Sequence, residues 1–137
     1  IYRIVVDTWN RTGTRVSYVD LPENLRTHQN TASFLDRFKV VAGNLPYAQT
    51  IVAHIARDGH YFIHPDIEQN RSITPREAAR IQTFPDDYEF VGSYSSVRKQ
   101  IGMAVPCKLS EIVITAILNC FSGIKYPYVE ANMEEDL

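Results

Sequence analysis

Apolar and β-branched residues near the start of the chain gather in two short runs that are typical of β-strands. Both runs lie within residues 1–20 and are separated by a polar, glycine-containing turn at residues 10–13. A second pair of runs lies within residues 50–63 and flanks Asp58 and Gly59, a dipeptide that strongly favours a two-residue hairpin turn. We therefore predict two β-hairpins, at residues 1–20 and 50–63.

The signals that start and stop a helix are clearest around residues 75–83. Thr74 is a favourable N-cap, Pro75 suits the first helical position, and Glu77 stands three residues after the cap, as in a capping box. Phe84 is followed by a proline, which disfavours helical geometry in the residue before it and so ends the helix. The pattern predicts a short, well-capped helix.

A second helix is predicted at residues 109–121. Apolar residues recur there at helical spacing, Ser110 is a suitable N-cap, and Gly123 is a natural stop. Together the elements indicate an α+β fold with a small, mostly antiparallel sheet, hairpins and two or three short helices. We expect one domain over residues 1–129 and a disordered acidic tail over residues 130–137.

The charged residues are unevenly distributed along the chain, and this limits how it could contact DNA. The 14 basic and 16 acidic residues give a formal net charge of −2, which excludes a strongly basic protein that coats nucleic acid. Four of the 16 acids lie in residues 130–137, so 14 basic and 12 acidic residues remain in residues 1–129, a net charge of +2. Any contact with DNA is therefore expected to be local.

The two cysteines, Cys107 and Cys120, form no disulfide framework in the sequence pattern and fit a reducing compartment. The longest apolar run, residues 112–121, is shorter than the roughly 18 residues that a membrane-spanning helix needs. We expect a cytoplasmic protein that does not associate with a membrane.

Histidines cluster in the sequence without forming a metal-binding pattern. In the predicted hairpin, strand alternation places His54 on one face and both His60 and His64 on the other. The spacings typical of zinc ligands are also missing from the sequence. We expect no metal site.

Two segments carry a family resemblance. Residues 71–86 read Arg-Ser-Ile-Thr-Pro-Arg-Glu-Ala-Ala-Arg-Ile-Gln-Thr-Phe-Pro-Asp, which resembles motif IX of DNA (cytosine-5) methyltransferases. Residues 100–106 read Gln-Ile-Gly-Met-Ala-Val-Pro, which resembles motif X of the same family. The residues that match motif IX and are expected to have a structural role are Arg71, Thr74, Arg76, Glu77, Arg80, Gln82, Phe84 and Pro85.

The resemblance implies a DNA-reading region and part of a cofactor pocket. In this family the stretch before motif IX belongs to the target recognition domain, which faces the DNA major groove, and motif X helps to enclose S-adenosylmethionine. The expected cofactor-binding residues are Gln100, Gly102, Met103, Ala104 and Val105. The expected DNA-binding residues are Arg57, Asp58, Gly59 and His60 at the hairpin tip, with Arg76 and Arg80 on the helix.

The sequence leaves other roles open for these residues. The hairpin tip can equally be a solvated turn, and Arg76 and Arg80 can instead form salt bridges that hold the helix in place. Glu77 and Arg80 are three residues apart and are themselves a plausible ion pair.

The chain departs from the family pattern at two positions of motif X. Met103 stands where the family has Asn, and this removes a hydrogen-bonding amide from a position that would face the cofactor. Cys107 stands where a second proline is usual. The pair Pro106-Cys107 is not the family's catalytic Pro-Cys motif, which lies far upstream of motif X, so we expect Cys107 to be a packing residue.

Several motifs on which the family's chemistry depends are missing from these 137 residues. They are the glycine-rich cofactor loop, the Pro-Cys-Gln nucleophile, the Glu-Asn-Val carboxylate and the Gln-Arg-x-Arg segment. Methyl transfer requires a thiolate, an acidic residue and a bound methyl donor. We therefore expect S-adenosylmethionine only in a complete enzyme, and neither cofactor nor activity in this chain alone.

The leading hypothesis is the C-terminal, target-recognition part of a bacterial DNA (cytosine-5) methyltransferase of the restriction-modification type. Its expected partners are duplex DNA and a catalytic domain or subunit, and exposed apolar surface makes self-association possible. One alternative is a non-catalytic DNA-binding or regulatory remnant of such an enzyme. Another is an independent metal-dependent or hydrolytic enzyme, which requires a carboxylate to converge with His28, His54, His60 or His64.

Overall fold

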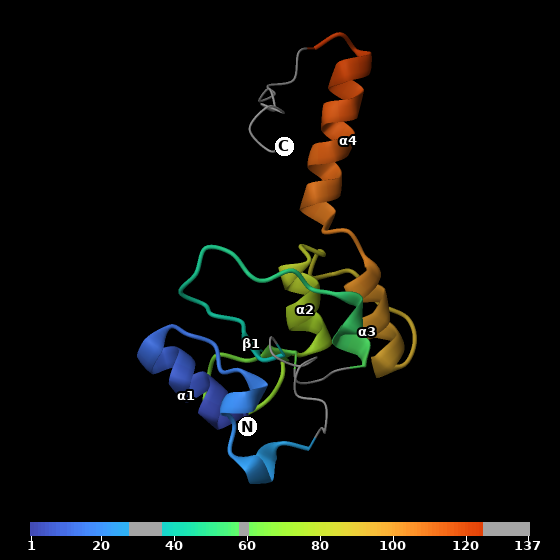
Figure 1. Ribbon diagram of the computed structural model, residues 1–137. Coiled ribbons are helices and arrows are strands. Elements are labelled where there is room, and N and C mark those ends of the chain that lie inside the picture. The colour runs from blue at the N-terminus through green and yellow to red at the C-terminus, as the bar shows by residue number, and fades with distance from the viewer. Residues whose placement is uncertain (28–36, 58–60, 125–137) are drawn as a thin grey trace, which may run out of the picture. The chain divides into compact units, whose positions relative to one another are not determined.

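The computed structural model describes residues 1–27, 37–57 and 61–124, apart from the side chain of His54 (Figure 1). By its internal contacts the chain divides into two compact units, Ile1–Ala104 and Val105–Leu137, where the sequence predicts one domain over residues 1–129. The predicted acidic tail lies outside the described residues. The elements, in chain order, are α1 (Tyr2–Thr12), the 3-10 helices η1 (Tyr18–Asp20) and η2 (Glu23–Leu25), β1 (Lys39–Val40), the 3-10 helix η4 (Ala53–Ala56), β2 (Phe62–Ile63), α2 (Pro75–Ile81), α3 (Tyr94–Met103) and α4 (Cys107–Phe121).

The prediction of a hairpin at residues 1–20 is wrong, because this segment begins with α1. The many β-branched residues favour a strand, but Val5 and Val6 are buried and Trp9 packs against the same apolar cluster. Residues spaced by three and four along a helix lie on one face, so helical geometry brings these side chains together. The helix ends at Gly13, whose φ of 67° is left-handed and whose N–H bonds the Trp9 carbonyl at 2.8 Å.

The two strands pair in parallel, not as an antiparallel hairpin. Lys39 faces Phe62 and Val40 faces Ile63 in this ladder. On its other side, β2 meets residues 71–73 in an antiparallel bridge between Ile63 and Ser72. The segment that resembles motif IX is thereby attached to the sheet before its helix begins.

Strand β2 separates two apolar clusters, because successive side chains of a strand point to opposite faces. Ile63 belongs to the cluster that also holds α1 residues and β1, and Phe62 belongs to the cluster formed with α2 and α3. Both side chains are fully buried. The second cluster contains Ile51, Ile55, Phe62, Ile73, Ala78, Ala79 and Ile101.

The prediction of a hairpin at residues 50–63 is also wrong in its first half. Ala53–Ala56 is the 3-10 helix η4, with Ile51 and Ile55 buried together against α3. The expected turn, residues 58–60, lies outside the described residues. Ile51 and Ile55 occupy alternate positions of the predicted strand, so the apolar pattern alone did not distinguish the two structures.

Helix α2 and its capping box are confirmed. The Thr74 hydroxyl accepts a hydrogen bond from the Glu77 N–H at 3.2 Å, and the Glu77 carboxylate accepts one from the Thr74 N–H at 2.7 Å. At the other end, the Phe84 N–H bonds the Ala79 carbonyl and the Thr83 N–H bonds the Arg80 carbonyl, the two bonds of a Schellman motif. Thr83 holds the left-handed position of this motif, with φ 60°.

Helix α3 is an element that the sequence analysis missed. Its N-cap is Ser93, whose hydroxyl accepts a hydrogen bond from the Ser96 N–H at 3.3 Å. Ile101 and Arg98 face the interior, and the Arg98 guanidinium lies 5.5 Å from the ring centre of Tyr94. Figure 1 shows α3 beside α2, in agreement with their contacts.

Helix α4 confirms the predicted C-terminal helix but begins earlier. Its first residue is Cys107 and its N-cap is Pro106, so the prediction that Ser110 caps the helix is wrong. It ends as predicted at Gly123, which has φ 71°, and the bonds Gly123 N–H to Cys120 and Ile124 N–H to Asn119 complete a Schellman motif.

The stretch Tyr94–Phe121, which holds both α3 and α4, has the length and apolar composition of a membrane-spanning helix. This is weak evidence, because α3 ends at Met103 and α4 begins only at Cys107. The 15 residues of α4 are about 22 Å long, shorter than the ~30 Å hydrocarbon core of a bilayer.

Candidate functional site

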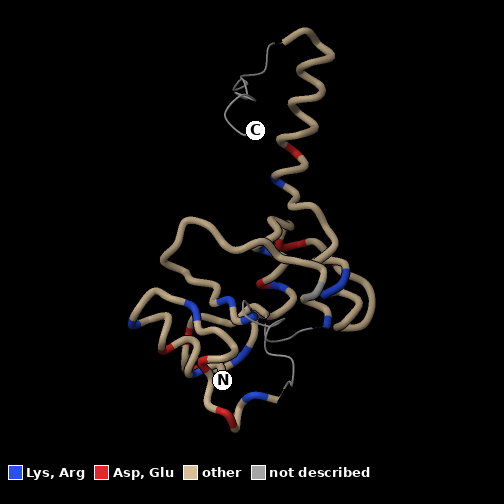
Figure 2. Tube along the Cα trace, viewed as in Figure 1, with Lys and Arg blue, Asp and Glu red and all other residues tan. Residues whose placement is uncertain are grey.

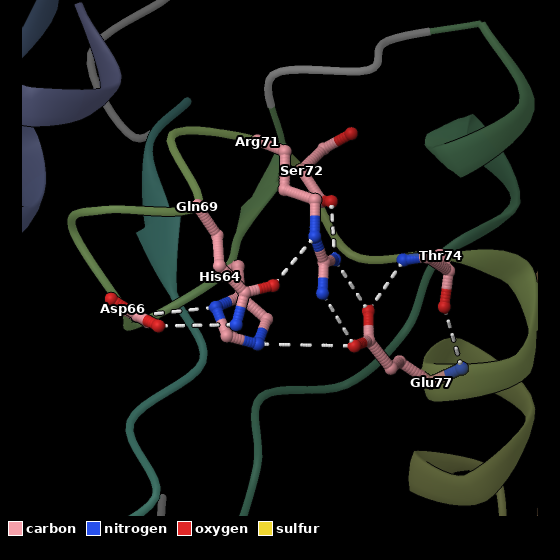
Figure 3. Close-up of polar contacts among 7 residues, drawn as sticks. All are labelled: His64, Asp66, Gln69, Arg71, Ser72, Thr74 and Glu77. Carbon is pink, nitrogen blue, oxygen red and sulfur yellow. Dashed lines mark hydrogen bonds and ion pairs between the residues drawn. The ribbon is translucent and has the colours of Figure 1, made fainter.

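The segment that resembles motif IX is held by an ion pair at the start of α2. Arg71 donates two parallel hydrogen bonds to the Glu77 carboxylate, each 2.8 Å long (Figure 3). The same carboxylate accepts a hydrogen bond from the Thr74 N–H. Arg71 also donates a hydrogen bond to the Ser72 carbonyl at 3.0 Å. Glu77 thus joins the helix N-terminus to the strand-like segment before it, in a geometry that is specific for arginine.

The pKa of Glu77 is lowered from 4.5 to about 2, chiefly because Arg71 donates hydrogen bonds to its carboxylate. Hydrogen bonds from Thr74 act in the same direction, while partial burial opposes them. His64 Nε2 lies 3.8 Å from Glu77 Oε1, and its Nδ1 accepts a hydrogen bond from the Asp66 N–H at 3.2 Å. The network therefore holds a charged carboxylate in place over a wide pH range.

A buried amide connects the two motif-like segments. Gln82, at the end of α2, is only 4% exposed, and its Nε2 donates to the carbonyls of Ile101 and Ala104 at 3.0 Å each. Its two acceptors belong to the last turn of α3 and the residue after it, where carbonyls lack the donor four residues on that helix geometry supplies elsewhere. The Ile101 carbonyl also accepts the Ala104 N–H, at 3.3 Å. Gln82 therefore fixes the segment that resembles motif X against the segment that resembles motif IX.

The five residues expected to bind a cofactor lie in different environments. Gly102 is packed, since a Cβ there would lie 2.8 Å from the Val52 carbonyl oxygen and 2.9 Å from Ile55 Cγ2. Gln100 is exposed and donates to the Val91 carbonyl at 2.9 Å, while Ala104 is half-buried and accepts the bond from Gln82. Met103 and Val105 are apolar yet exposed, at 65% and 60%.

Beside Gly102, α3 and η4 border a cleft of about 440 Å³. Within the part of the chain that the structure describes, its lining consists of two basic residues, three serines, two alanines and one methionine, with no acidic residue. The lining residues are Ala53, Ala56, Arg57, Ser93, Ser95, Ser96, Lys99 and Met103. The cleft therefore joins one expected DNA-binding residue and one expected cofactor-binding residue in a positively charged hollow.

The two arginines of α2 that were candidates for DNA contact are engaged within the chain. Arg80 donates two hydrogen bonds to Asp86, of 2.7 and 3.0 Å, and Arg76 donates to the Tyr88 carbonyl at 3.0 Å. The guanidinium of Arg76 also lies 5.8 Å from the ring centre of Phe90. Both arginines fasten α2 to the loop that follows it, but only Arg80 does so through the kind of salt bridge stated above as the alternative.

The remaining candidates for DNA contact are at residues 57–60. Arg57 is exposed at the end of η4, and Asp58, Gly59 and His60 lie outside the described residues. Among the histidines, the structure describes only the side chain of His64, and the described residues hold no cluster of metal ligands.

The sequence analysis missed or misassigned three contacts of this site. Glu77 pairs with Arg71 and Arg80 pairs with Asp86, so the proposed Glu77–Arg80 pair is wrong. Both observed pairs span six residues, beyond the helical spacing on which the proposal depended. That Lys99 lines the same cleft as Arg57 was missed because α3 itself was missed, although the Ser93 cap was a usable signal.

Comparison with known proteins places most of the chain in one family. The model of the family described as C-5 cytosine-specific DNA methylase matches residues 5–119. The type II methyltransferase M.Bpa9945I of Bacillus paralicheniformis is 49% identical over 123 residues, which are 90% of this chain and 27% of the relative. M.BbvI of Brevibacillus brevis is 51% identical over 67 residues, or 49% of this chain and 18% of the relative.

The similarity extends to plants. The DNA (cytosine-5)-methyltransferase 1B of rice, Oryza sativa, is 40% identical over 90 residues, which are 66% of this chain and 6% of the relative. No solved structure matches the chain. The chain thus spans about a quarter, or less, of the length of these relatives.

Proposed function

This chain belongs to the C-5 cytosine-specific DNA methylase family, and we propose that it is the C-terminal, target-recognition part of a DNA (cytosine-5) methyltransferase of the restriction-modification type. The observation that carries this proposal is the Gln82 bridge, which joins segments resembling motifs IX and X into one unit. Such a unit positions a DNA-reading region against a cofactor pocket whose larger part lies elsewhere. The relatives are about four times longer than the match or more, in keeping with a missing catalytic part.

The DNA-reading role falls on the region before α2. Arg57 and residues 58–60 are proposed to face the DNA, as the family resemblance implies. Arg76 and Arg80 are proposed as secondary contacts, because each would have to share or leave an intrachain partner in order to bind a phosphate. For the region as a whole, the α+β class with further antiparallel pairing remains our proposal.

Helix α4 is proposed to dock onto the catalytic domain or subunit. Its side chains at three consecutive positions, Ile112, Val113 and Ile114, are all exposed, although consecutive residues point in different directions around a helix. Figure 2 shows charged residues only near its start, where Lys108 pairs with Glu111 at 2.7 Å. A helix that is apolar on all sides is normally buried, so without its partner the chain is expected to self-associate.

The complete enzyme is proposed to act in the bacterial cytoplasm, with S-adenosylmethionine as methyl donor. Residues 100–105 would contribute one wall of the cofactor pocket. Of these, Met103 and Val105 present exposed side chains, whereas Gly102 serves the packing of α3 on η4. We propose that the chain alone binds no cofactor and transfers no methyl group.

Co-expression with a chain that carries the glycine-rich and Pro-Cys motifs tests this function. We expect the two chains to purify together and to methylate duplex DNA with labelled S-adenosylmethionine, while each chain alone is inactive. Ile117→Glu should abolish the complex, and Lys108→Ala should preserve it, because Lys108 lies in the charged first turn of α4. If the wild-type pair forms no complex, or if this chain methylates DNA alone, the proposal is wrong.

Met103 favours a second candidate function, a non-catalytic DNA-binding or regulatory remnant. A domain that no longer binds cofactor can lose the Asn that the family has at this position without consequence. The isolated chain would then still shift duplex DNA, but co-expression with a chain that carries the missing motifs would give no methylation. Methylation by the co-expressed pair, with Met103→Asn changing the KM for S-adenosylmethionine, would exclude the remnant.

A further inference from the structure

The cleft between α3 and η4 has the composition of an anion site. Arg57, directly after η4, and Lys99, in α3, both line the cleft, and the other polar residues of its described lining are serines. We infer that this cleft binds a phosphate group of the DNA backbone. The inference rests on the proposed function, and it assigns the cleft a positioning role that is independent of base sequence.

Both basic side chains are available for such a ligand. Within the described residues, neither Arg57 nor Lys99 forms an ion pair, in contrast to Arg71, Arg80 and Lys108, which have carboxylate partners. Two positive charges that line one cleft repel each other, and an anion between them removes that repulsion. The described lining holds no carboxylate, so none of its side chains would compete with an anion for Arg57 and Lys99.

The hydroxyl groups complete the chemistry of a phosphate site. Ser95, Ser96 and Lys99 are spaced by three and four residues, so they share one side of α3. The Ser96 hydroxyl accepts a hydrogen bond from Gln100 at 3.3 Å, which leaves its own hydrogen to donate into the cleft. A phosphate oxygen accepts hydrogen bonds and donates none when ionised, so this lining of donors suits it.

A close backbone contact between α3 and the segment around η4 fixes the two walls of the cleft relative to each other. Gly102 lets the backbone of α3 approach the backbone before η4, where a Cβ would lie 2.8 Å from the Val52 carbonyl oxygen. Gly102 lies next to Met103 and three residues after Lys99, both of which line the cleft. The backbone segments that carry Lys99 and Arg57 are therefore packed together before DNA arrives, which lowers the ordering cost of binding.

Salt-dependent binding of fluorescent duplexes to the full 137-residue chain tests the inference. Two duplexes of unrelated sequence are used, from about 50 to 200 mM salt, where each phosphate contact contributes about one unit to the slope of log K against log salt. Lys99→Ala and Arg57→Ala should each weaken binding to both duplexes by roughly three- to tenfold, and each should lower the slope by about 1. Ser95→Ala should weaken binding less.

Arg3→Ala is the matched control, because Arg3 is an exposed basic residue of α1 that does not line the cleft. It should leave the slope unchanged. If wild-type chain binds DNA but both cleft variants keep its slope, the phosphate assignment is wrong while the proposed function stands. If wild-type chain binds neither duplex, the phosphate assignment is wrong, and the co-expression experiment decides the proposed function separately. If the variants lose binding of inorganic phosphate but not of DNA, the ligand is a free anion and the DNA assignment is overturned.

Discussion

The side chain of Gln82 donates a hydrogen bond to the carbonyl of Ala104, 22 residues away, at 3.0 Å. Gln82 is the C-cap of the short helix α2, and Ala104 is the C-cap of α3. Through this bond a capped helix that reads as an isolated element in the sequence becomes a joint between two parts of the chain. This joint can position the DNA-reading region and the cofactor pocket even if neither Gln82 nor Ala104 contacts DNA or cofactor.

Replacing Gln82 with Leu should destabilise the chain by about 1–3 kcal/mol, because the Ala104 carbonyl loses its donor in a part-buried place. The Ile101 carbonyl keeps the Ala104 N–H as a second donor, at 3.3 Å. Urea unfolding followed by circular dichroism measures the change. Gln100→Leu is the control, since its exposed amide should cost under about 1 kcal/mol. Equal effects of the two substitutions would contradict a special role for Gln82.

The stability of the chain should depend on pH through Glu77. Its folded-state pKa, about 2, is below the ordinary value of 4.5, so its stabilising contribution is complete above about pH 5 and is lost as pH falls toward 2. Both partners are about one-third exposed, at 34% for Arg71 and 32% for Glu77, so solvent screening limits the contribution to about 1–2 kcal/mol.

Comparison of wild type with Glu77→Gln isolates this contribution from that of the other carboxylates. The difference in free energy of unfolding should be largest near pH 7 and should be mostly lost near pH 2, where about half of the Glu77 side chains are protonated. Denaturant unfolding at a series of pH values gives both curves. A difference that stays constant with pH would show that the ion pair does not stabilise the fold.

Thr83→Gly should stabilise the chain. Thr83 has φ 60°, and a β-branched residue in this left-handed region is strained by about 1–2 kcal/mol, whereas glycine is the usual residue at the same position of a Schellman motif. Glycine also increases the entropy of the unfolded chain, so the expected net gain is about 0.5–1 kcal/mol. Thermal unfolding should show a higher Tm for Thr83→Gly and no gain for Thr83→Ala. A lower Tm for the glycine variant would indicate that the threonine hydroxyl outweighs the strain.

Gly102→Ala should destabilise the chain by about 1–3 kcal/mol, because the new methyl group would overlap the Val52 carbonyl and the Ile55 side chain. Gly43→Ala is the matched control, since no atom lies within 4 Å of the corresponding Cβ. The control should be neutral or slightly stabilising. Chemical denaturation of both variants measures the contrast, and a neutral Gly102→Ala would refute the close approach of α3 to the segment before η4.

Local signals in the sequence were sufficient where the structure is held by neighbours along the chain. Thr74, Pro75 and Glu77 predicted the start of α2, because a capping box is completed within four residues. Gly123 predicted the end of α4 for the same kind of reason. Residue types alone also identified the family, through the segments at residues 71–86 and 100–106.

Local signals failed where distant packing decides. The β-branched start of the chain favours a strand by itself, and it becomes α1 because helical geometry buries Val5 and Val6 against Phe38 and Ile63. The strand pattern at residues 50–56 became η4 because Ile55 packs on α3. Neither partner is near in sequence, so neither could be read from the segment itself.

The sequence by itself therefore determined the family, the capped helix α2 and the apolar character of α4. Tertiary structure alone decided that Arg71 and not Arg80 binds Glu77, that Gln82 supports the end of α3, and that Arg57 and Lys99 line one cleft. The physical reason is the range of the interactions. Caps and periodicity act within one or two turns, whereas ion pairs, buried amides and clefts form between segments that only the folded chain brings together.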